Sequence, residues 1–283
     1  LSLNTLIGAL RSGATAALEF DNALQERQAI SAASNGERVK LRTTIIETST
    51  GTKFSAKELT EAATIMSQAG LGVKEITSSL KEVALVATAT GSGIKSVTDV
   101  FTSAIGVFKI QATETASVSN QLIAALNLSK LTIDKVATGL QYASNIAAES
   151  GLSFSETTAA LAAMSNQGIT AGSTLGTGFR QVLLDLQTPS TKLKARLDEL
   201  GISLKDIDPS SNGLIGSFEN LRKAGFTAAD AFETMEKRAA NAFIALLRGV
   251  DDQRTLREAI LLSNGAADAN KTAMESLENQ SKR

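Results

Sequence analysis

The sequence of 283 residues contains no cysteine, no histidine and no tryptophan. Without cysteine the chain can form neither a disulfide bond nor a thiolate metal site, and without histidine it lacks the commonest general base and metal ligand. Aromatic residues make up 4% of the chain, with Tyr142 as the single tyrosine, whereas hydrophobic residues make up 43%. The core must therefore consist mainly of alanine, leucine, isoleucine and valine, and such small side chains predict closely packed helices.

The charge balance of the chain is nearly neutral, with a formal net charge of −1 and an isoelectric point near 5.8. A nucleic-acid-binding protein usually carries a basic excess, because contacts with phosphates need lysine and arginine. This chain has no such excess. Lys192, Lys194 and Arg196 form a local basic cluster, and their spacing predicts one solvated face of a helix.

No stretch of the sequence resembles a membrane span or a secretory signal peptide. A membrane-spanning helix needs about 20 consecutive apolar residues, and the nearest stretch, residues 82–94, is shorter and contains threonine, serine and glycine. That composition predicts the packed end of a helix. The sequence begins with Leu1 and not with methionine, so we expect it to be a piece of a longer protein.

The sequence predicts an all-α fold, because it has only two prolines and little strict alternation of apolar and polar residues. Apolar residues recur at helical spacing through residues 1–34 and predict one long helix. Residues 41–52 are rich in threonine and isoleucine, and a helix and an extended segment both remain open for them. We therefore divide the chain into an N-terminal helix and linker, 1–50, and a core region, 51–283.

Helix-start and turn signals recur through the first half of the core region. Residues 55–58 and 153–156 are capping boxes, in which a serine and a glutamate three residues later bond each other's backbone amides. Turn sequences recur at a roughly constant spacing, at Leu71, Ile110 and Leu152. We interpret residues 55–170 as three successive helical hairpins that pack on one another in a compact bundle or a short array.

The second half of the core region predicts further helices. A glycine-rich helical segment covers 171–200, as one helix to about Leu186 and a second from Thr191. Residues 201–213 predict a loop, because glycine, proline, serine and asparagine are frequent there. The C-terminal helices, within 213–283, include one capped by Thr227 that ends at Gly249, one from Asp251 and one from about residue 266.

Four glycines, Gly168, Gly172, Gly176 and Gly178, fall in the stretch NQGITAGSTLGTGFRQVLLDLQTPS (166–190). A phosphate-binding P-loop would need a lysine after its last glycine, and a dinucleotide fingerprint would need a third glycine and a preceding strand. Both are absent. Gly168 is predicted to end the preceding helix. All four are candidate packing or interface residues, since a face without side chains lets a neighbouring helix or another chain approach closely.

The carboxylates of the chain do not form a catalytic pattern. Glu149-Ser150-Gly151 resembles the start of the catalytic motif of soluble lytic transglycosylases, in which the glutamate is the general acid. The glycine-rich and Met-Gln elements that should follow are absent, so the favoured interpretation is a helix end followed by a capped helix. Asp206 and Asp208 flank the predicted loop with too few ligands for calcium, and Asp251-Asp252 are typical of a helix start. We predict no enzyme, no metal and no cofactor.

Residues from about 53 to the end resemble the core region of phage tail tape measure proteins. The stretches that carry the resemblance are GLSFSETTAALAAMSNQGITAGSTLGTGFRQVLLDLQTPS (151–190), LDELGISLKDI (197–207), RAANAFIALL (238–247) and MESLENQSKR (274–283). Their order follows that of the family, and residues 151–205 are the most specific block. The family often has a Phe-Gly pair before the final apolar helix, where this sequence has Arg238-Ala239-Ala240-Asn241.

The resemblance implies a virion structural protein in the tail tube lumen or at the tail tip, present in the host cytoplasm during assembly. It implies a role in setting tail length, in tail tip assembly and in DNA ejection. It also implies a trimer or hexamer that contacts tail tube proteins, tip or baseplate proteins and assembly chaperones, and contact with phage DNA or the host envelope during ejection. It implies no catalytic residue for this region.

Glycines and capping boxes interrupt the helical pattern again and again, which predicts a chain that folds back on itself, whereas a ruler must be extended. We therefore expect a compact docking module at one end of the ruler. Two alternatives remain open: a helical-repeat binding scaffold outside phages, and a peptidoglycan-cleaving tail protein built around Glu149.

Overall fold

The computed structural model describes residues 34–263, and the all-α fold class is confirmed. These residues form fourteen α-helices and one short 3-10 helix, and they contain no strand. The helix predicted over residues 1–34, apart from Ser34, and the last predicted helix lie outside the described residues.

The described chain divides into two units, residues 34–123 and 124–263. The division falls inside α7 (Thr115–Asn127). The predicted division into residues 1–50 and 51–283 stays a prediction.

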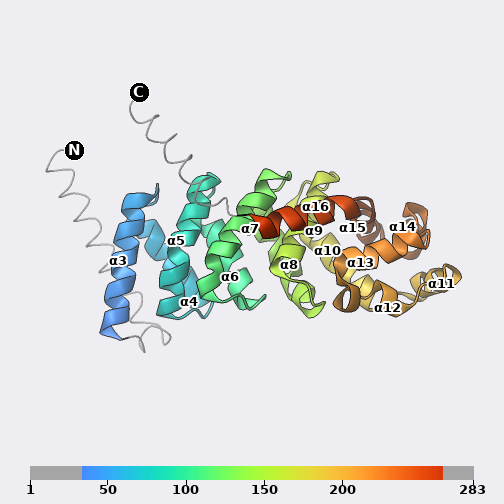
Figure 1. Ribbon diagram of the computed structural model, residues 1–283, viewed down its shortest axis with the longest axis horizontal. Coiled ribbons are helices and arrows are strands. Elements are labelled where there is room, and N and C mark those ends of the chain that lie inside the picture. The colour runs from blue at the N-terminus through green and yellow to red at the C-terminus, as the bar shows by residue number, and fades with distance from the viewer. Residues whose placement is uncertain (1–33, 264–283) are drawn as a thin grey trace, which may run out of the picture. The chain divides into compact units, whose positions relative to one another are not determined.

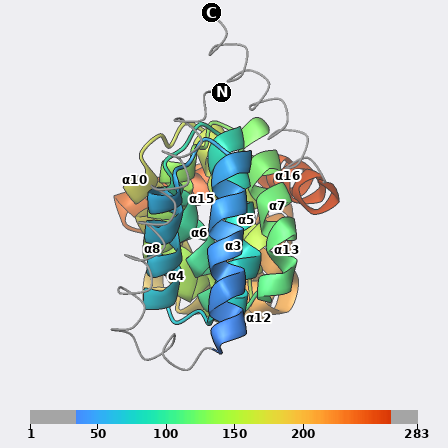
Figure 2. The same ribbon diagram turned by 90° about the vertical axis from the view of Figure 1, so that its left-hand side faces the viewer.

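The first unit contains two helical hairpins stacked side by side. Its elements are α3 (Asn35–Gly51), α4 (Ala56–Gln68), α5 (Val73–Ala89), α6 (Ile94–Gly106) and η1 (Ala112–Glu114). Helix α3 lies beside α5, and α4 lies beside α6, so that the longer helices form one layer and the shorter helices a second. Figure 2 shows α3 flanked by α4 and α5. Of residues 41–52, for which the sequence left two conformations open, 41–51 are helical and Thr52 is extended.

The two hairpins of the first unit repeat each other in length and in core positions. The interval from the start of α3 to the start of α5 is the same as the interval from the start of α4 to the start of α6. Both long helices have 17 residues and both short helices have 13. Each hairpin buries an equivalent apolar face against its neighbour. Buried positions on α4 recur on α6 at the repeat interval, in the pairs Leu59/Val97, Ala62/Val100, Ala63/Phe101 and Met66/Ala104.

Capping boxes mark the helix starts that follow Ser55 and Ser153, whereas α6 begins after Gly93 without one. In the first predicted box, the Glu58 amide donates to Ser55 Oγ at 3.3 Å and the Ser55 amide donates to the Glu58 carboxylate at 2.9 Å. The box formed by Ser153 and Glu156 has the same two bonds, at 3.2 and 3.0 Å. Both predicted boxes are confirmed. Each satisfies backbone amides that the first helical turn leaves without partners.

The second unit contains a third hairpin of the same kind and seven further helices. The hairpin is α8 (Ile133–Glu149) and α9 (Phe154–Asn166), again with 17 and 13 residues. The other helices are α10 (Gly172–Gln187), α11 (Thr191–Glu199), α12 (Leu204–Ile207), α13 (Pro209–Lys223), α14 (Ala228–Thr234), α15 (Lys237–Arg248) and α16 (Val250–Leu262).

Helix α10 lies in the middle of the second unit, against α8 on one side and α15 on the other (Figure 1). Helix α9 packs against α16. Three phenylalanines supply much of the bulk that the alanine-rich helices lack: the Phe243 ring lies 4.8 Å from the Phe218 ring and 5.3 Å from the Phe226 ring, centre to centre. Tilted rings at this separation add to the free energy gained from burial.

The first two hairpins pair differently from the sequence interpretation, whereas α8 and α9 pair across the predicted turn at Leu152. All six helices predicted over residues 55–170 are present, but the repeated unit is a long helix followed by a short one and starts with α3. The third hairpin begins only at Ile133, later than the repeat interval from Val73 would place it, because η1 and α7 are inserted. A turn sequence marks where a helix ends, but it does not reveal which two helices share a core.

Two further predictions in the second unit are wrong. Residues 201–213 are not one loop, because α12 and the first turn of α13 lie within them, and only Gly213 leaves the helical conformation inside α13, with φ +67°. The helix predicted from Thr227 to Gly249 is two helices, with extended backbone at Met235 and Glu236. The predicted cap at Thr227 and the helix start near Asp251 are confirmed.

Candidate functional site

The four candidate glycines do not lie on one face. Gly168 follows the end of α9 in a left-handed conformation, with φ +103°. The Ile169 amide donates to the Met164 carbonyl at 3.2 Å and the Gly168 amide to that of Ser165 at 3.1 Å, the bonding pattern that often ends a helix. Gly168 therefore ends α9 as predicted. Gly168 lies before α10, so it does not share a helix face with Gly172 and Gly176.

Gly172 and Gly176 bring α10 into close contact with α8. A Cβ added to Gly176 would lie 2.5 Å from the Gly139 carbonyl oxygen and 2.9 Å from the Gly139 Cα. A Cβ added to Gly172 would lie 3.0 Å from the Lys135 Cα. Both contacts are with backbone, which cannot move aside as a flexible side chain can. The two helices therefore approach at a distance that only glycine permits on α10.

Gly178 faces α15 on another side of α10. Its added Cβ would lie 2.8 Å from the Ala242 Cβ and 3.9 Å from the Met164 Cε. Glycine on α10 thus serves two different helix contacts within the chain. Because Gly172, Gly176 and Gly178 all lie inside a helix, they do not form a flexible phosphate-binding loop.

Glu149 is the last residue of α8, and Ser150 and Gly151 begin the turn that leads to α9. Ser150 Oγ donates to the Ile146 carbonyl at 2.7 Å, and Gly151 has φ +78°. The turn between α5 and α6 has the same construction, with Thr90 Oγ1 on the Val86 carbonyl at 2.7 Å and Gly91 at φ +66°.

In the turn between α5 and α6, the residue equivalent to Glu149 is Ala89. The turn therefore forms without a carboxylate, which supports the structural interpretation of Glu149-Ser150-Gly151. Glu149 is exposed and borders a cavity of about 380 Å³, together with Gln187, Lys205 and Asp208. Gln187 Nε2 donates to Ser150 Oγ at 2.8 Å and so ties the turn to the end of α10.

The aspartates that the sequence singled out serve as helix caps and ion-pair partners. Asp206 accepts from the Ser203 amide at 2.9 Å, and Asp208 accepts from the Ser210 amide at 2.9 Å. Hydrogen bonds from the Ser203 and Ser210 side chains lower the pKa of Asp206 and Asp208, respectively. Asp251 begins α16 and pairs with Arg222 at 2.8 Å.

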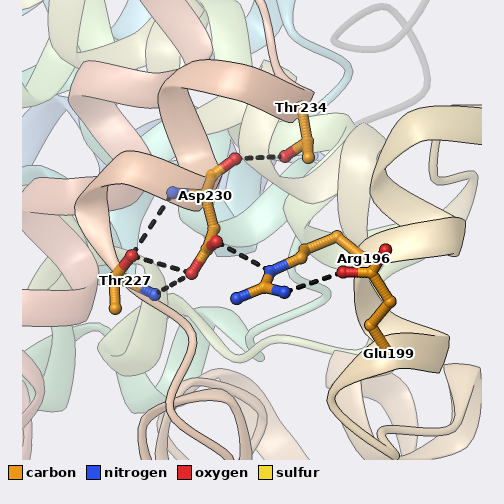
Figure 3. Close-up of polar contacts among 5 residues, drawn as sticks. All are labelled: Arg196, Glu199, Thr227, Asp230 and Thr234. Carbon is orange, nitrogen blue, oxygen red and sulfur yellow. Dashed lines mark hydrogen bonds and ion pairs between the residues drawn. The ribbon is translucent and has the colours of Figure 1, made fainter.

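Arg196 is not part of a solvated basic face, as its sequence pattern predicted. Lys192 and Lys194 are exposed, but Arg196 turns towards α14, where its Nε lies 2.7 Å from the carboxylate of buried Asp230 (Figure 3). Its guanidinium also pairs with Glu199 at 2.8 Å. The pair with Asp230 joins two helices that are distant in sequence, α11 and α14, which local spacing does not reveal.

Asp230 also caps its own helix. Its carboxylate accepts from the Thr227 amide and from Thr227 Oγ1, both at 2.7 Å (Figure 3). Burial raises the pKa of Asp230, but the hydrogen bonds from Thr227 and Arg196 outweigh burial, and the pKa lies below its usual value. The signal that sequence reasoning missed is Thr227-Ala-Ala-Asp230, a capping box with aspartate in place of glutamate.

A groove of about 1200 Å³ runs between α3 and α5 in the first unit. Side chains of both charge signs line the groove. Lys74 from α5 forms an ion pair across it with Glu37 from α3, at 3.6 Å. Elsewhere in the groove, Lys81 from α5 and Glu47 from α3 are exposed. A groove lined by both lysines and glutamates is better suited to bind a polar protein surface than to bind an anion.

Within residues 34–263, no three acidic, histidine or cysteine side chains group as metal ligands. No helix in the same part of the chain is long and apolar enough to cross a membrane. The described residues thus define an all-α protein of stacked hairpins, in which the residues singled out by sequence serve helix packing and capping.

The comparisons with known proteins identify the family of this helical-hairpin protein. Residues 42–249 match the phage-related minor tail protein family, and because the match covers most of the chain, the chain belongs to this family. The resemblance to tape measure proteins is also confirmed. The chain is 29% identical over 147 residues to a probable tape measure protein of Escherichia phage P2, a match that covers 50% of the chain and 18% of that protein.

A second relative is the tape measure protein of Pneumococcus phage Dp-1. The identity is 25% over 256 residues, which are 88% of the chain and 22% of the relative. The aligned part of the chain thus spans about a fifth of the length of both relatives. No solved structure matches the chain significantly. Family membership supports a structural role in a phage tail.

Proposed function

We propose that this chain is a compact docking module of a tape measure protein and not the part that measures length. The observation that carries the proposal is the short, folded-back path of the chain: no described helix exceeds 17 residues, and successive helices stack in layers. A continuous helix advances about 1.5 Å per residue. A stacked hairpin instead returns the chain close to where it began and contributes little axial length.

The proposed module lies in the tail tube lumen or at the tail tip, where it helps the whole protein set tail length, assemble the tip and eject DNA. Its proposed partners are other copies of the chain, as a trimer or hexamer, together with tube, tip and baseplate proteins and assembly chaperones. Contacts with phage DNA or the host envelope would form during DNA ejection. The names of the two relatives and the tail family support this assignment.

An interface role for the candidate glycines stays a prediction. Within the chain, α8 covers Gly172 and Gly176, and α15 covers Gly178. A contact with another copy would therefore need a different surface of α10, or would depend on the glycines through the rigid α8–α10 contact that they permit.

The experiment that tests the docking module is a pair of in-frame deletions in the phage or prophage that encodes the chain. One removes residues 73–110, a single repeat interval, and the other removes residues 55–250. Electron microscopy then measures tail length. If the region were part of a helical ruler, tails would shorten by about 57 Å and about 290 Å, at about 1.5 Å per residue.

We expect no proportional shortening. A docking module that is damaged gives tails without a proper tip, or no tails, and any tubes that form keep their length. Intact tails that shorten in proportion to the two deletions would contradict the proposal.

The groove between α3 and α5 supports a docking role, because it offers a polar surface with both signs of charge. The variant Lys81→Glu reverses a charge inside the groove, and Lys57→Glu reverses an exposed charge on α4 outside it. We expect K81E to reduce tail assembly and K57E to leave it unchanged, at equal thermal stability of the purified chains. Equal tail yields for the two variants would show that the groove takes no part in docking.

A further inference from the structure

Helices α3 and α5 leave a groove between them, whereas α8 and α10, which are likewise joined through a short helix, pack closely. Gly172 and Gly176, the first and fifth residues of α10, lie against the backbone of α8. The first and fifth residues of α5 are Val73 and Thr77, and both line the groove. Because α5 has side chains where α10 has none, α5 cannot approach α3 as closely. The groove therefore follows from the residues that α5 has at these two positions.

Some of the charged side chains that line the groove already have partners within the first unit. They take part in the ion pair of Glu37 with Lys74, in the cap of α5 by Glu75 and in the bond that Glu82 accepts from Ser119. Three exposed side chains have no partner among residues 34–263, namely Lys40 and Glu47 on α3 and Lys81 on α5. Their charges are therefore available to another molecule in the groove.

The three available charges follow a fixed order along the groove. Helices α3 and α5 run in the same direction, since α4 carries the chain back between them, and the ion pair of Lys74 with Glu37 brings their first turns level. Lys40 and Glu47 are the sixth and thirteenth residues of α3, and Lys81 is the ninth residue of α5. At about 1.5 Å per residue, two positive charges about 4–5 Å apart are followed by a negative charge about 6 Å further on.

A helix fits this groove better than an extended chain does. An extended chain needs partners for its backbone N–H and C=O groups, whereas a helix bonds them internally. The Thr77 hydroxyl already donates to the Val73 carbonyl of α5 at 2.7 Å. The Ser78 hydroxyl likewise donates to the Lys74 carbonyl, at 3.0 Å. A groove between two helices also accepts the side-chain ridge of a third helix.

We propose that the groove binds one helix of another tail protein, which presents an acidic side chain to Lys40 and Lys81 and a basic side chain to Glu47. The inference rests on the proposed docking function and names the chemistry of the partner. The two side chains of the partner lie about one to two helical turns apart, to match the spacing of the charges in the groove. Opposite charges at two levels fix the direction of the bound helix, because a reversed helix would bring like charges together.

Substitutions in the groove test the proposal in the phage or prophage that encodes the chain. Lys81→Glu and Glu47→Lys reverse the charge at the two levels, and Ser78→Trp fills the groove without changing its charge. Lys57→Glu on α4, outside the groove, is the control. All four side chains are exposed, so the purified variants should unfold at the temperature of the parent chain. We expect each groove variant to lower the yield of complete tails about tenfold or more, and K57E to leave it unchanged.

The outcomes separate this inference from the docking function on which it rests. If K81E lowered the yield but E47K left it unchanged or raised it, the partner surface would be acidic throughout, which overturns the helix with both charges and leaves docking intact. Unchanged yields with all three groove variants would overturn the inference, while the two deletions still decide the docking function on their own.

Second-site suppressors then identify the partner helix. We expect suppressors of K81E to replace an acidic residue by a basic one, and suppressors of E47K to do the reverse. Both kinds should fall in one segment of a single tail protein, about three, four or seven residues apart, as on one face of a helix. Suppressors in two different proteins, or at alternate residues of one segment, would overturn the proposal. Suppressors within this chain would overturn it in favour of a second copy.

Discussion

Two helix contacts in the second unit are held together by opposite means. Helices α8 and α10 meet closely because Gly172 and Gly176 have no side chain that would collide with the α8 backbone at Lys135 and Gly139. Helices α11 and α14 meet through the ion pair between the partly exposed Arg196 and the buried Asp230. The first contact depends on glycines that have no side chain, and the second depends on an attraction between opposite charges.

This difference predicts different sensitivities. A contact between backbones tolerates no added volume but does not respond to pH, because no titrating group takes part. A buried ion pair tolerates modest changes in volume but loses its stabilising charge when the carboxylate is protonated. Substitution and pH should therefore separate the two contacts.

The largest effect is expected from Gly176→Leu. Its Cβ alone would lie 2.5 Å from the Gly139 carbonyl oxygen, so α8 and α10 would have to separate. Overpacking typically costs about 1–3 kcal/mol and occasionally more, and we expect about 3 kcal/mol here, since backbone has to move. Urea denaturation measured by circular dichroism at pH 7 and pH 5 reports the loss, which should be equal at both values.

The matched control is Gly36→Ala on α3, where an added Cβ meets nothing within 4 Å. Alanine favours a helix over glycine by about 1 kcal/mol, so this variant should be as stable as the parent chain or more stable. If G176L were equally well tolerated, the close contact between α8 and α10 would not contribute to stability.

The next largest effect is expected from Asp230→Ala. It removes the capping bonds to Thr227 and leaves the partly buried Arg196 with Glu199 in place of two carboxylate partners. Loss of a cap costs about 1 kcal/mol, and we expect about 2 kcal/mol in total after solvent screening of the half-exposed arginine. Thermal unfolding of D230A at pH 7 measures the loss.

The pH dependence of this contact has a definite sign. The pKa of Asp230 is lowered in the folded chain, whereas the pKa of an unfolded aspartate is about 3.9. The stabilisation by Asp230 is therefore complete above about pH 5 and is lost as pH falls through about 4 and below towards the folded pKa. The difference in stability between the parent chain and D230A should shrink over that range. A difference that stays constant down to about pH 2.5 would contradict the lowered pKa.

A smaller effect is expected from Gly139→Ser, which gives α8 the residue that α5 has at the equivalent position. The equivalent residue of α5 is Ser79, which is fully buried; both are the seventh residue of their helix. On α8 an added Cβ would lie 3.1 Å from Leu161 Cδ1, a flexible side-chain atom. We expect a loss of about 1 kcal/mol, as mild overpacking is partly offset by the higher helix propensity of serine. A loss as large as that of G176L would mean that Leu161 cannot move aside.

Local signals were sufficient to predict most of the helices. The boxes at Ser55 and Ser153, the end of α9 at Gly168 and the cap at Thr227 all depend on residues within a few positions of one another. Such short-range bonds are encoded by sequence spacing. The all-α fold class and the hairpin character followed from them.

The partners of these helices could not be predicted in the same way. The sequence placed Gly172 and Gly176 on a packing face but did not identify α8 as the helix that covers it. Likewise, the spacing of Lys192, Lys194 and Arg196 predicted a solvated face, and the carboxylate that binds Arg196 belongs to a helix far along the chain. Contacts of this range depend on which hairpins stack, and the turn sequences do not encode that choice.

The smallest expected effect comes from Ser79→Ala, and its sign is opposite to the others. Ser79 Oγ is buried and has no hydrogen-bond partner among residues 34–263, so the folded state gains nothing from this hydroxyl. A buried polar group without a partner costs free energy, and alanine is the better helix former. We therefore expect S79A to stabilise the chain by about 0.5–1 kcal/mol in urea denaturation. The comparison is Ser78→Ala on the exposed side of α5, where the serine hydroxyl has partners in the Lys74 and Glu75 carbonyls. If S79A gained no more than S78A, the hydroxyl of Ser79 would carry no penalty. Serine and glycine would then differ at this position of the repeat only through the contact with Leu161 that glycine permits on α8.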